Sequence, residues 1–218
     1  MTKLMNLDLE SPKEFFIFCN RYRPITAHNL TFPKTFVSAA YSYCSSKEFS
    51  RKYEDGTSTY LPFLPAENDC KIISPYLTTA MNNYRIEYDA EICRKMYYPK
   101  YPSRISAIFA FGDLDTCKKV YEKYPNNGWD LSTIKKFTLI DSPFTRVIKV
   151  NMEIVSIARY AYLISYSPEN DLDTLWKHYW SGGGNIQMEL PDVTVQRKKY
   201  ESGEIFEYLI EWSVVLSE

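Results

Sequence analysis

The sequence predicts a single-domain α+β fold, with helices inserted between the strands of a mixed or mostly antiparallel central sheet. Two observations lead to this prediction. Short apolar runs bounded by turn residues alternate with longer segments of helical periodicity. No internal repeat, low-complexity linker or change in composition divides the 218 residues. A chain of that length buries enough apolar surface to form one domain over residues 1–218.

The first third is predicted to form a strand, a helix and a loop. The apolar run at residues 14–19 (EFFIFC) stops before the stretch NRYRP (20–24), because proline cannot continue a central ladder. Apolar side chains recur at helical spacing over residues 36–53 and predict a helix. Three turn signals at residues 54–69 predict a loop.

The middle third is predicted to contain a long helix, a buried strand and a second helix. Ser74-Pro75 opens the first helix, which ends near residue 98, because proline suits a first helical turn. Its expected core-facing stripe is Leu77, Met81, Tyr84, Tyr88, Ile92 and Met96. Residues 105–111 form an apolar run typical of a strand buried on both faces. Asp113 then favours a helix over 114–123.

The last third is predicted to alternate strands and helices. The expected elements are strands at 135–140 and 145–151 and helices at 152–165 and 171–180. The run Gly182-Gly183-Gly184 ends the last helix as a tight turn and is followed by a loop. Residues 204–216 predict a long closing strand or a bent strand pair.

Composition narrows the possible environments and partners. The net charge of −1 gives no global field for nucleic acid or membrane binding. Five widely spaced cysteines without a CxxC pair indicate neither a disulfide framework nor a zinc site, so we expect reduced thiols, a cytoplasmic location and no metal. The longest apolar run near the N-terminus, FFIFC, is too short to span a bilayer. The 19 Tyr, 12 Phe and 4 Trp residues are expected mostly in the core.

Several common chemistries lack their sequence patterns. His28 and His178 lie near no GxSxG motif or evident cysteine nucleophile, which argues against a hydrolase triad. The glycine run at 182–184 follows a helix instead of opening one, which is the wrong context for a phosphate cradle. Glu204 and Glu207 stand three residues apart on the predicted strand, so they point to opposite faces and cannot flank one glycosidic bond without a bulge.

Three groups of polar residues remain, each beside a predicted strand. They are Arg21 with Arg23 at the end of the first strand, Ser103, Arg104 and Ser106 before the middle strand, and Glu207 in the last strand. Each group also has an ordinary interpretation. The arginines would be solvated charges, Ser106 a hydrogen-bonded core hydroxyl, and Glu207 part of a charged strand edge with Glu204 and Glu211.

The order of these groups resembles that of the ADP-ribosyltransferase superfamily, whose members use an Arg or His on the first strand, a Ser/Thr or Tyr on a middle strand, and a Glu that opens a late strand. The stretch FEYLIEWSVVL (206–216) is similar to the glutamate strand of poly-ADP-ribose-polymerase-type members. The stretch SRISAIFAFGDLDTCKKVYEKY (103–124) is similar to the middle strand and its following helix. The stretch PSRIS (102–106), together with the later helix end WKHYWSG (176–182), also resembles phage and bacterial proteins.

The resemblance implies that NAD is the substrate and that no metal takes part. The implied catalytic residues are Glu207, Arg21 and Ser106. The implied NAD-binding residues are Arg21, Arg23, Ser103, Arg104, Ser106, Phe109 and Tyr43, with Tyr41 as another ring for the nicotinamide. Arg21 is the first choice for the diphosphate, assisted by Arg23 or Arg104, because a guanidinium pairs with two oxygens at once.

The resemblance further implies a macromolecular acceptor, protein or nucleic acid, and a role as a phage effector or as a bacterial toxin or defence component with an antitoxin or host protein partner. Basic spots that a nucleic acid would use, if they are not simply solvated, are Arg94-Lys95, Lys118-Lys119, Lys135-Lys136 and Arg197-Lys198-Lys199. Two alternatives stay open: a binding protein with a tyrosine-rich interface that inhibits a host factor, and a transferase fold that binds a nucleotide without turnover.

Overall fold

The computed structural model describes residues 12–20, 22–42, 45–58, 75–125, 127–164, 171–191 and 196–217. The chain folds as two compact units, each built from segments that are distant in sequence. The first unit contains Met1–Ser58, Lys100–Lys149 and Ile205–Glu218, and the second contains Thr59–Pro99 and Val150–Glu204. The predicted α+β class with antiparallel sheets is confirmed, whereas a single domain over 1–218 stays a prediction.

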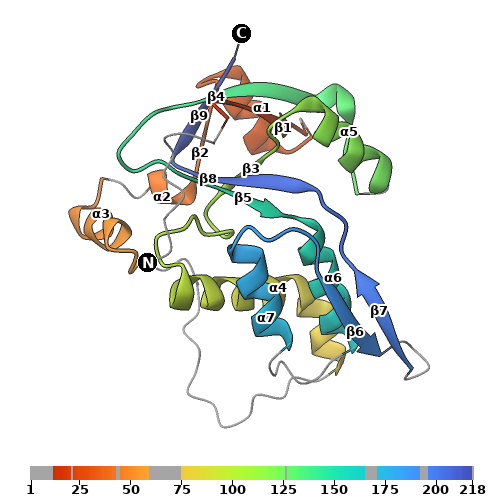
Figure 1. Cartoon of the computed structure of the whole chain (residues 1–218). Coiled ribbons are helices and arrows are strands. Elements are labelled where there is room, and N and C mark those ends of the chain that lie inside the picture. The colour runs from red at the N-terminus through yellow and green to blue at the C-terminus, as the bar shows by residue number, and fades with distance from the viewer. Residues whose placement is uncertain are drawn as a thin grey trace. The chain divides into compact units, whose positions relative to one another are not determined.

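Two sheets form the first unit, instead of the one central sheet expected (Figure 1). The four-stranded sheet has the order β1 (Glu14–Phe18), β4 (Ile134–Leu139), β9 (Ser213–Leu216) and β2 (Thr35–Val37). Its neighbouring strands are all antiparallel. The three-stranded sheet has the order β3 (Ile108–Ala110), β8 (Phe206–Glu211) and β5 (Arg146–Asn151). The strands predicted at 14–19, 135–140 and 145–151 and the bent pair over 204–216 are therefore confirmed.

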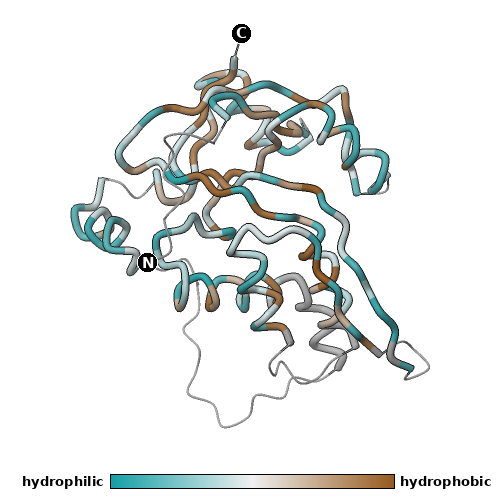
Figure 2. The backbone as a smooth tube through the Cα atoms, viewed as in Figure 1, coloured by the Kyte–Doolittle hydropathy of each residue, from teal (hydrophilic) through white to brown (hydrophobic). Residues whose placement is uncertain are grey.

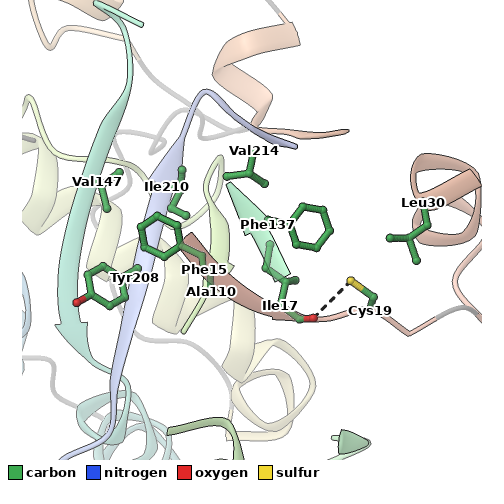
Figure 3. Close-up of a cluster of buried hydrophobic side chains, with 10 residues drawn as sticks. All are labelled: Phe15, Ile17, Cys19, Leu30, Ala110, Phe137, Val147, Tyr208, Ile210 and Val214. Atoms are coloured by element: carbon green, nitrogen blue, oxygen red, sulfur yellow. Dashed lines mark hydrogen bonds between the residues drawn. The ribbon is translucent and has the colours of Figure 1, made fainter. Parts of the chain in front are cut away.

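The core of the first unit lies where side chains from both sheets meet (Figure 3). Phe15 of β1 packs edge-on against Tyr208 of β8, with ring centroids 5.3 Å apart. Phe137 of β4 is fully buried and stacks on Phe36 of β2 at 4.8 Å. Alternate residues along β8 point into this core, so Tyr208 and Ile210 belong to it. Glu207, Leu209 and Glu211 lie on the opposite face of the strand.

Short helices complete the first unit. They are α1 (Pro24–Thr31), α2 (Ala39–Ser42), α3 (Lys47–Glu54), α5 (Leu114–Lys123) and the 3₁₀ turn η1 (Leu131–Thr133). The prediction for α5 is confirmed, and Asp113 caps it by accepting a hydrogen bond from the Thr116 amide at 2.6 Å. Figure 2 shows that α3 is largely hydrophilic, as expected for a helix with a mostly solvated surface.

The single helix predicted over 36–53 is wrong, because this segment forms β2, α2 and α3. Phe36 pairs with Val214 of β9, and this non-local pairing overrides the local helical spacing. Ser46 then starts a new helix, since its side chain accepts a hydrogen bond from the Phe49 amide at 3.3 Å.

The second unit consists of three packed helices and a hairpin. The helices are α4 (Pro75–Tyr97), α6 (Glu153–Ile164) and α7 (Asp171–Trp180), as predicted. The hairpin of β6 (Gln187–Pro191) and β7 (Arg197–Glu201) was not predicted, since this segment was expected to be a loop. Figure 2 shows that β7 is hydrophilic. Among the described residues, no helix combines the length and the apolarity that a membrane crossing requires.

The buried face of α4 differs from its predicted apolar stripe. Its buried apolar residues are Ile86, Ala90 and Cys93, whereas Met96 is exposed. The Trp180 indole N–H donates to the Ala90 carbonyl at 2.8 Å, which brings α7 against this face. The side chains of Leu77 and Met81 lie outside the described residues. The buried face is offset from the predicted stripe because the long charged side chains of Glu91 and Arg94 are buried and occupy part of it.

The core of the first unit should depend strongly on Phe137. We expect Phe137→Ala to lower the free energy of unfolding by about 3–5 kcal/mol, because a fully buried ring is lost and a cavity remains. Ile140→Ala, at a 37% exposed position on the same segment, should cost less than about 1 kcal/mol. Urea denaturation measures both values. Equal losses for the two variants would contradict the described core.

Candidate functional site

The pairing of β3 with β8 brings together residues that are about a hundred positions apart. Ile108 pairs with Ile210 and Ala110 with Tyr208 in an antiparallel register. The turn that precedes β3 therefore lies beside the C-terminal end of β8. The strand β1 also neighbours β3, through a bridge between Phe16 and Phe111. All three strands that carry the predicted polar groups, or lead to them, are thus neighbours in the first unit.

Arg104 and Glu207 form a buried ion pair across this pairing. The Arg104 Nη1 atom lies 3.2 Å from the Glu207 Oε1 atom. Their side chains are only 7% and 9% exposed. A buried ion pair must overcome a large desolvation cost, so it is a weak source of net stability and a frequent feature of functional sites. This pair joins two residues that the sequence singled out separately.

Ser103 to Ser106 form a tight turn just before β3. The Ser106 and Ala107 amides both donate to the Ser103 carbonyl, at 3.1 and 2.8 Å. The Ser103 hydroxyl accepts from the Ile105 amide at 3.2 Å, which is the local bonding typical of serine in turns. The Ser103 amide donates to the Glu211 Oε1 atom at 3.1 Å, so the end of β8 holds the turn. This tight turn places the Arg104 side chain against Glu207.

Ser106 lies in this turn and not on the strand, which corrects the predicted strand over 105–111. Its hydroxyl accepts from the Ala40 amide and its carbonyl from the Ala39 amide, both at 3.0 Å. These two amides open α2 and lack partners within that helix. Ser106 therefore caps α2 from a distant part of the chain.

Phe109 also departs from the prediction, because β3 is not buried on both faces. The Phe109 side chain is 39% exposed, and the Arg104 guanidinium lies over its ring, 5.1 Å from the centroid. Phe109 pairs with Leu209, which stands between Glu207 and Glu211 on β8. Directly paired residues share a face, so Phe109 and both carboxylates lie on the face opposite the core. Arg104 thus contacts an aromatic ring and a carboxylate on one sheet face.

The other predicted site residues are not all brought to this face. Arg21 and Tyr43 lie outside the described residues. Arg23 is exposed and stands at the N-cap of α1, where its carbonyl accepts from the amides of the first helical turn. Tyr41 packs edge-on against Trp212, with centroids 5.1 Å apart. Among the predicted site residues that the structure describes, one contiguous group forms, and it consists of the turn Ser103 to Ser106, Phe109 and Glu207.

Three further residues support this group, and the sequence did not indicate this role for them: Ser38, Glu211 and Trp212. Trp212 joins β8 to β9 with a φ of 115°, a left-handed conformation that is strained for a bulky residue. Its amide donates to the Ser38 hydroxyl at 3.0 Å, and its carbonyl accepts from the Ser38 amide at 2.8 Å. Glu207 and Glu211 are four residues apart, so strand alternation alone indicates that they share a face.

Other chemistries find little support among the described residues. Burial raises the pKa of the Cys93 and Cys117 thiols to about 12, so neither is a thiolate at neutral pH. No group of three His, Cys, Asp or Glu side chains in the described part of the chain is placed to hold a metal ion. Gly182, with a φ of 73°, makes the predicted tight turn after α7. Glu204 lies outside β8 and accepts from the Asn185 amide at 3.1 Å.

Several predicted basic spots are neutralised locally. Arg94 is buried and forms a bidentate ion pair with Glu91, at 2.7 and 2.8 Å, so it is not a surface contact for nucleic acid. Lys118 pairs with Asp115 at 2.9 Å and Lys136 with Glu14 at 3.0 Å. Lys198 and Lys199 are exposed on β7. The Arg197 side chain lies outside the described residues.

The buried pair should show energetic coupling in a double-mutant cycle. We expect Arg104→Met to lower the free energy of unfolding by about 3–5 kcal/mol, because it leaves Glu207 as a buried charge without its partner. Adding Glu207→Gln should recover at least about 1 kcal/mol of that loss. The exposed pair Lys52 and Glu48 on α3 serves as the control and should be nearly additive. Additivity at Arg104 and Glu207 in urea denaturation would contradict the contact.

Comparison with known proteins identifies a family without an assigned activity. Among curated proteins, none matches the chain. A family model described as "Protein of unknown function (DUF2441)" matches residues 26–198. That span includes Arg104, the turn around it and Phe109, and it ends before Glu207. It covers well over half of the sequence, and the chain therefore belongs to the DUF2441 family.

Proposed function

We propose that the protein is an ADP-ribosyltransferase that cleaves NAD and transfers ADP-ribose to a macromolecule. The observation that carries the proposal is the buried contact between Arg104 and Glu207 on one face of the β3–β8 pair. The resemblance to the superfamily rests on the order of three strand-associated motifs, and a shared site requires their strands to be neighbours. The antiparallel sheets of the first unit are compatible with this fold type.

The reaction requires a carboxylate in the position proposed for Glu207. The bond between C1′ of the nicotinamide ribose and the ring nitrogen breaks, and its electron pair leaves with neutral nicotinamide. C1′ then carries oxocarbenium-like positive charge until an acceptor oxygen or nitrogen bonds to it and releases a proton. A strand-mounted carboxylate beside C1′ stabilises that charge and accepts a hydrogen bond from a ribose hydroxyl. Glu207 has the burial and the rigid support for this role.

Arg104 and Phe109 are the proposed contacts for the rest of NAD. A guanidinium fork pairs well with diphosphate oxygens, and a half-exposed ring beside it offers a face for the nicotinamide. Ser103 and Ser106 act in this proposal as positioning residues, because their hydroxyls accept hydrogen bonds from the backbone of the turn and of α2. Arg21, Arg23 and Tyr43 stay predicted NAD contacts.

The acceptor in this proposal is a protein or a nucleic acid, as for a phage effector or a bacterial toxin held in check by an antitoxin or host protein. The exposed Lys198 and Lys199 of β7 would suit a phosphate backbone. We propose a cytoplasmic location, where NAD is abundant and thiols stay reduced. Cys19, Cys93 and Cys117 are buried and are not paired in disulfides, in keeping with that environment.

A second candidate function is a binding protein without enzymatic activity. The observation that favours it is the strong exposure of three apolar side chains in and beside α1, those of Tyr22, Ile25 and Phe32. Exposed apolar groups of this kind mark interaction surfaces in many soluble proteins. A folded Glu207→Gln variant of such a protein should keep its partner binding, since Glu207 is buried and lies on a different element. The same variant of a transferase should lose its activity.

The direct test is NAD consumption by the purified protein incubated with cell lysate. We expect nicotinamide release by the wild type and a loss of at least about 100-fold in Glu207→Gln, since the carboxylate would act on charge that develops only in the transition state. Glu48→Gln on α3 is the control for removal of one carboxylate and should keep full activity. Equal rates for the two variants, or no release by the wild type, would contradict the transferase.

A further inference from the structure

The Arg104 guanidinium is the shared partner of Glu207 and of any anion bound beside Phe109. We propose that the diphosphate of a nucleotide competes with Glu207 for Arg104, so that ligand binding weakens the ion pair between Arg104 and the carboxylate. The inference rests on the proposed function, because it assigns the ligand class and the coupling of the same site. It concerns binding, however, and can be tested without any turnover.

The competition follows from charge and burial. The pair has its nearest atoms 3.2 Å apart, and both side chains are more than nine-tenths buried. Charges so poorly solvated interact strongly, and two anions that approach one guanidinium also repel each other. A diphosphate that binds Arg104 therefore weakens the hold of Arg104 on Glu207. This coupling requires no complete displacement, since a guanidinium that contacts both anions shares one positive charge between them.

Phe109 determines which anions the site would favour. Its ring is 39% exposed, and the guanidinium lies 5.1 Å from its centroid. The contact supports the guanidinium independently of Glu207, so Arg104 keeps a defined place when the ion pair loosens. The exposed part of the ring offers an aromatic face next to the cation. An aromatic ring joined to a diphosphate matches both features, which points to nucleotides rather than to inorganic anions.

The coupling would make the carboxylate available only when substrate is bound. In the free protein Glu207 is paired with Arg104, whose positive charge opposes the stabilisation of further positive charge on a ribose. When a diphosphate engages Arg104, the guanidinium compensates less of the negative charge on Glu207, and the carboxylate acts more strongly on the ligand. Thermodynamic linkage requires the effect to be reciprocal. If anion binding weakens the ion pair by a given free energy, removal of the Glu207 charge must strengthen anion binding by the same free energy.

The test is calorimetric titration of the full chain with ADP, which has the diphosphate and an aromatic ring but no nicotinamide to release. We expect Glu207→Gln to bind ADP about 10-fold more tightly than the wild type, a size typical of coupling between two sites. Glu207→Asp, which keeps the charge on a shorter side chain, should give a smaller gain. Arg104→Met should bind ADP at least about 10-fold more weakly, as loss of a charge-assisted contact. Glu48→Gln should match the wild type.

Unchanged or weaker ADP binding in both Glu207 variants, relative to Glu48→Gln, would overturn the proposal, and so would the absence of ADP binding in all proteins. Thermal melting verifies that each variant is folded, and Arg104→Lys replaces Arg104→Met if the latter is not. Tighter ADP binding by Glu207→Gln together with no NAD cleavage by the wild type would support the coupled site and contradict the transferase. NAD cleavage without the ADP effect would do the reverse.

Discussion

The antiparallel pairing of β3 with β8 is the constraint on which the candidate site depends. It brings the turn around Arg104 next to β8, a strand that begins about a hundred residues later at Phe206. Because side chains alternate along a strand, this register puts Tyr208 and Ile210 in the core and both carboxylates on the opposite face. Both faces of β8 are buried, so a slip by one residue would exchange the two sets and move the carboxylates from the face that holds Arg104 into the apolar core. The apolar core therefore fixes the position of Glu207.

The joint at Trp212 explains how one chain segment serves two sheets. The strand β8 belongs to the three-stranded sheet and β9 to the four-stranded sheet, with Trp212 as the only residue between them. Its left-handed backbone costs on the order of 1–3 kcal/mol and persists only where the surroundings impose it. Ser38 does so with two hydrogen bonds, and the Trp212 ring stacks on Phe144 at 4.9 Å. The same joint places Glu211 where it can hold the Ser103 amide.

Much of the fold follows from local signals in the sequence, and the errors occur where distant segments decide. Asp113 marks the start of α5 by itself, because a cap acts on amides three residues away. The spacing around Phe36 looks helical, yet its pairing with β9 makes it a strand. The hairpin strand β7 carries Lys198 and Lys199 in succession, so it lacks the apolar alternation that predicts a strand. In the site, Arg104 and Glu207 were both recognisable as residue types, but their contact depends on a register that one sequence does not reveal.

A crystal structure of the protein with a non-cleavable NAD analogue would test the central claim most directly. The account predicts diphosphate oxygens within hydrogen-bonding distance of the Arg104 guanidinium, the nicotinamide ring at Phe109, and a ribose hydroxyl at the Glu207 carboxylate. It also predicts that the Arg104 to Glu207 distance exceeds the 3.2 Å of the free protein. An analogue bound elsewhere, or bound here with that contact unchanged, would contradict the account.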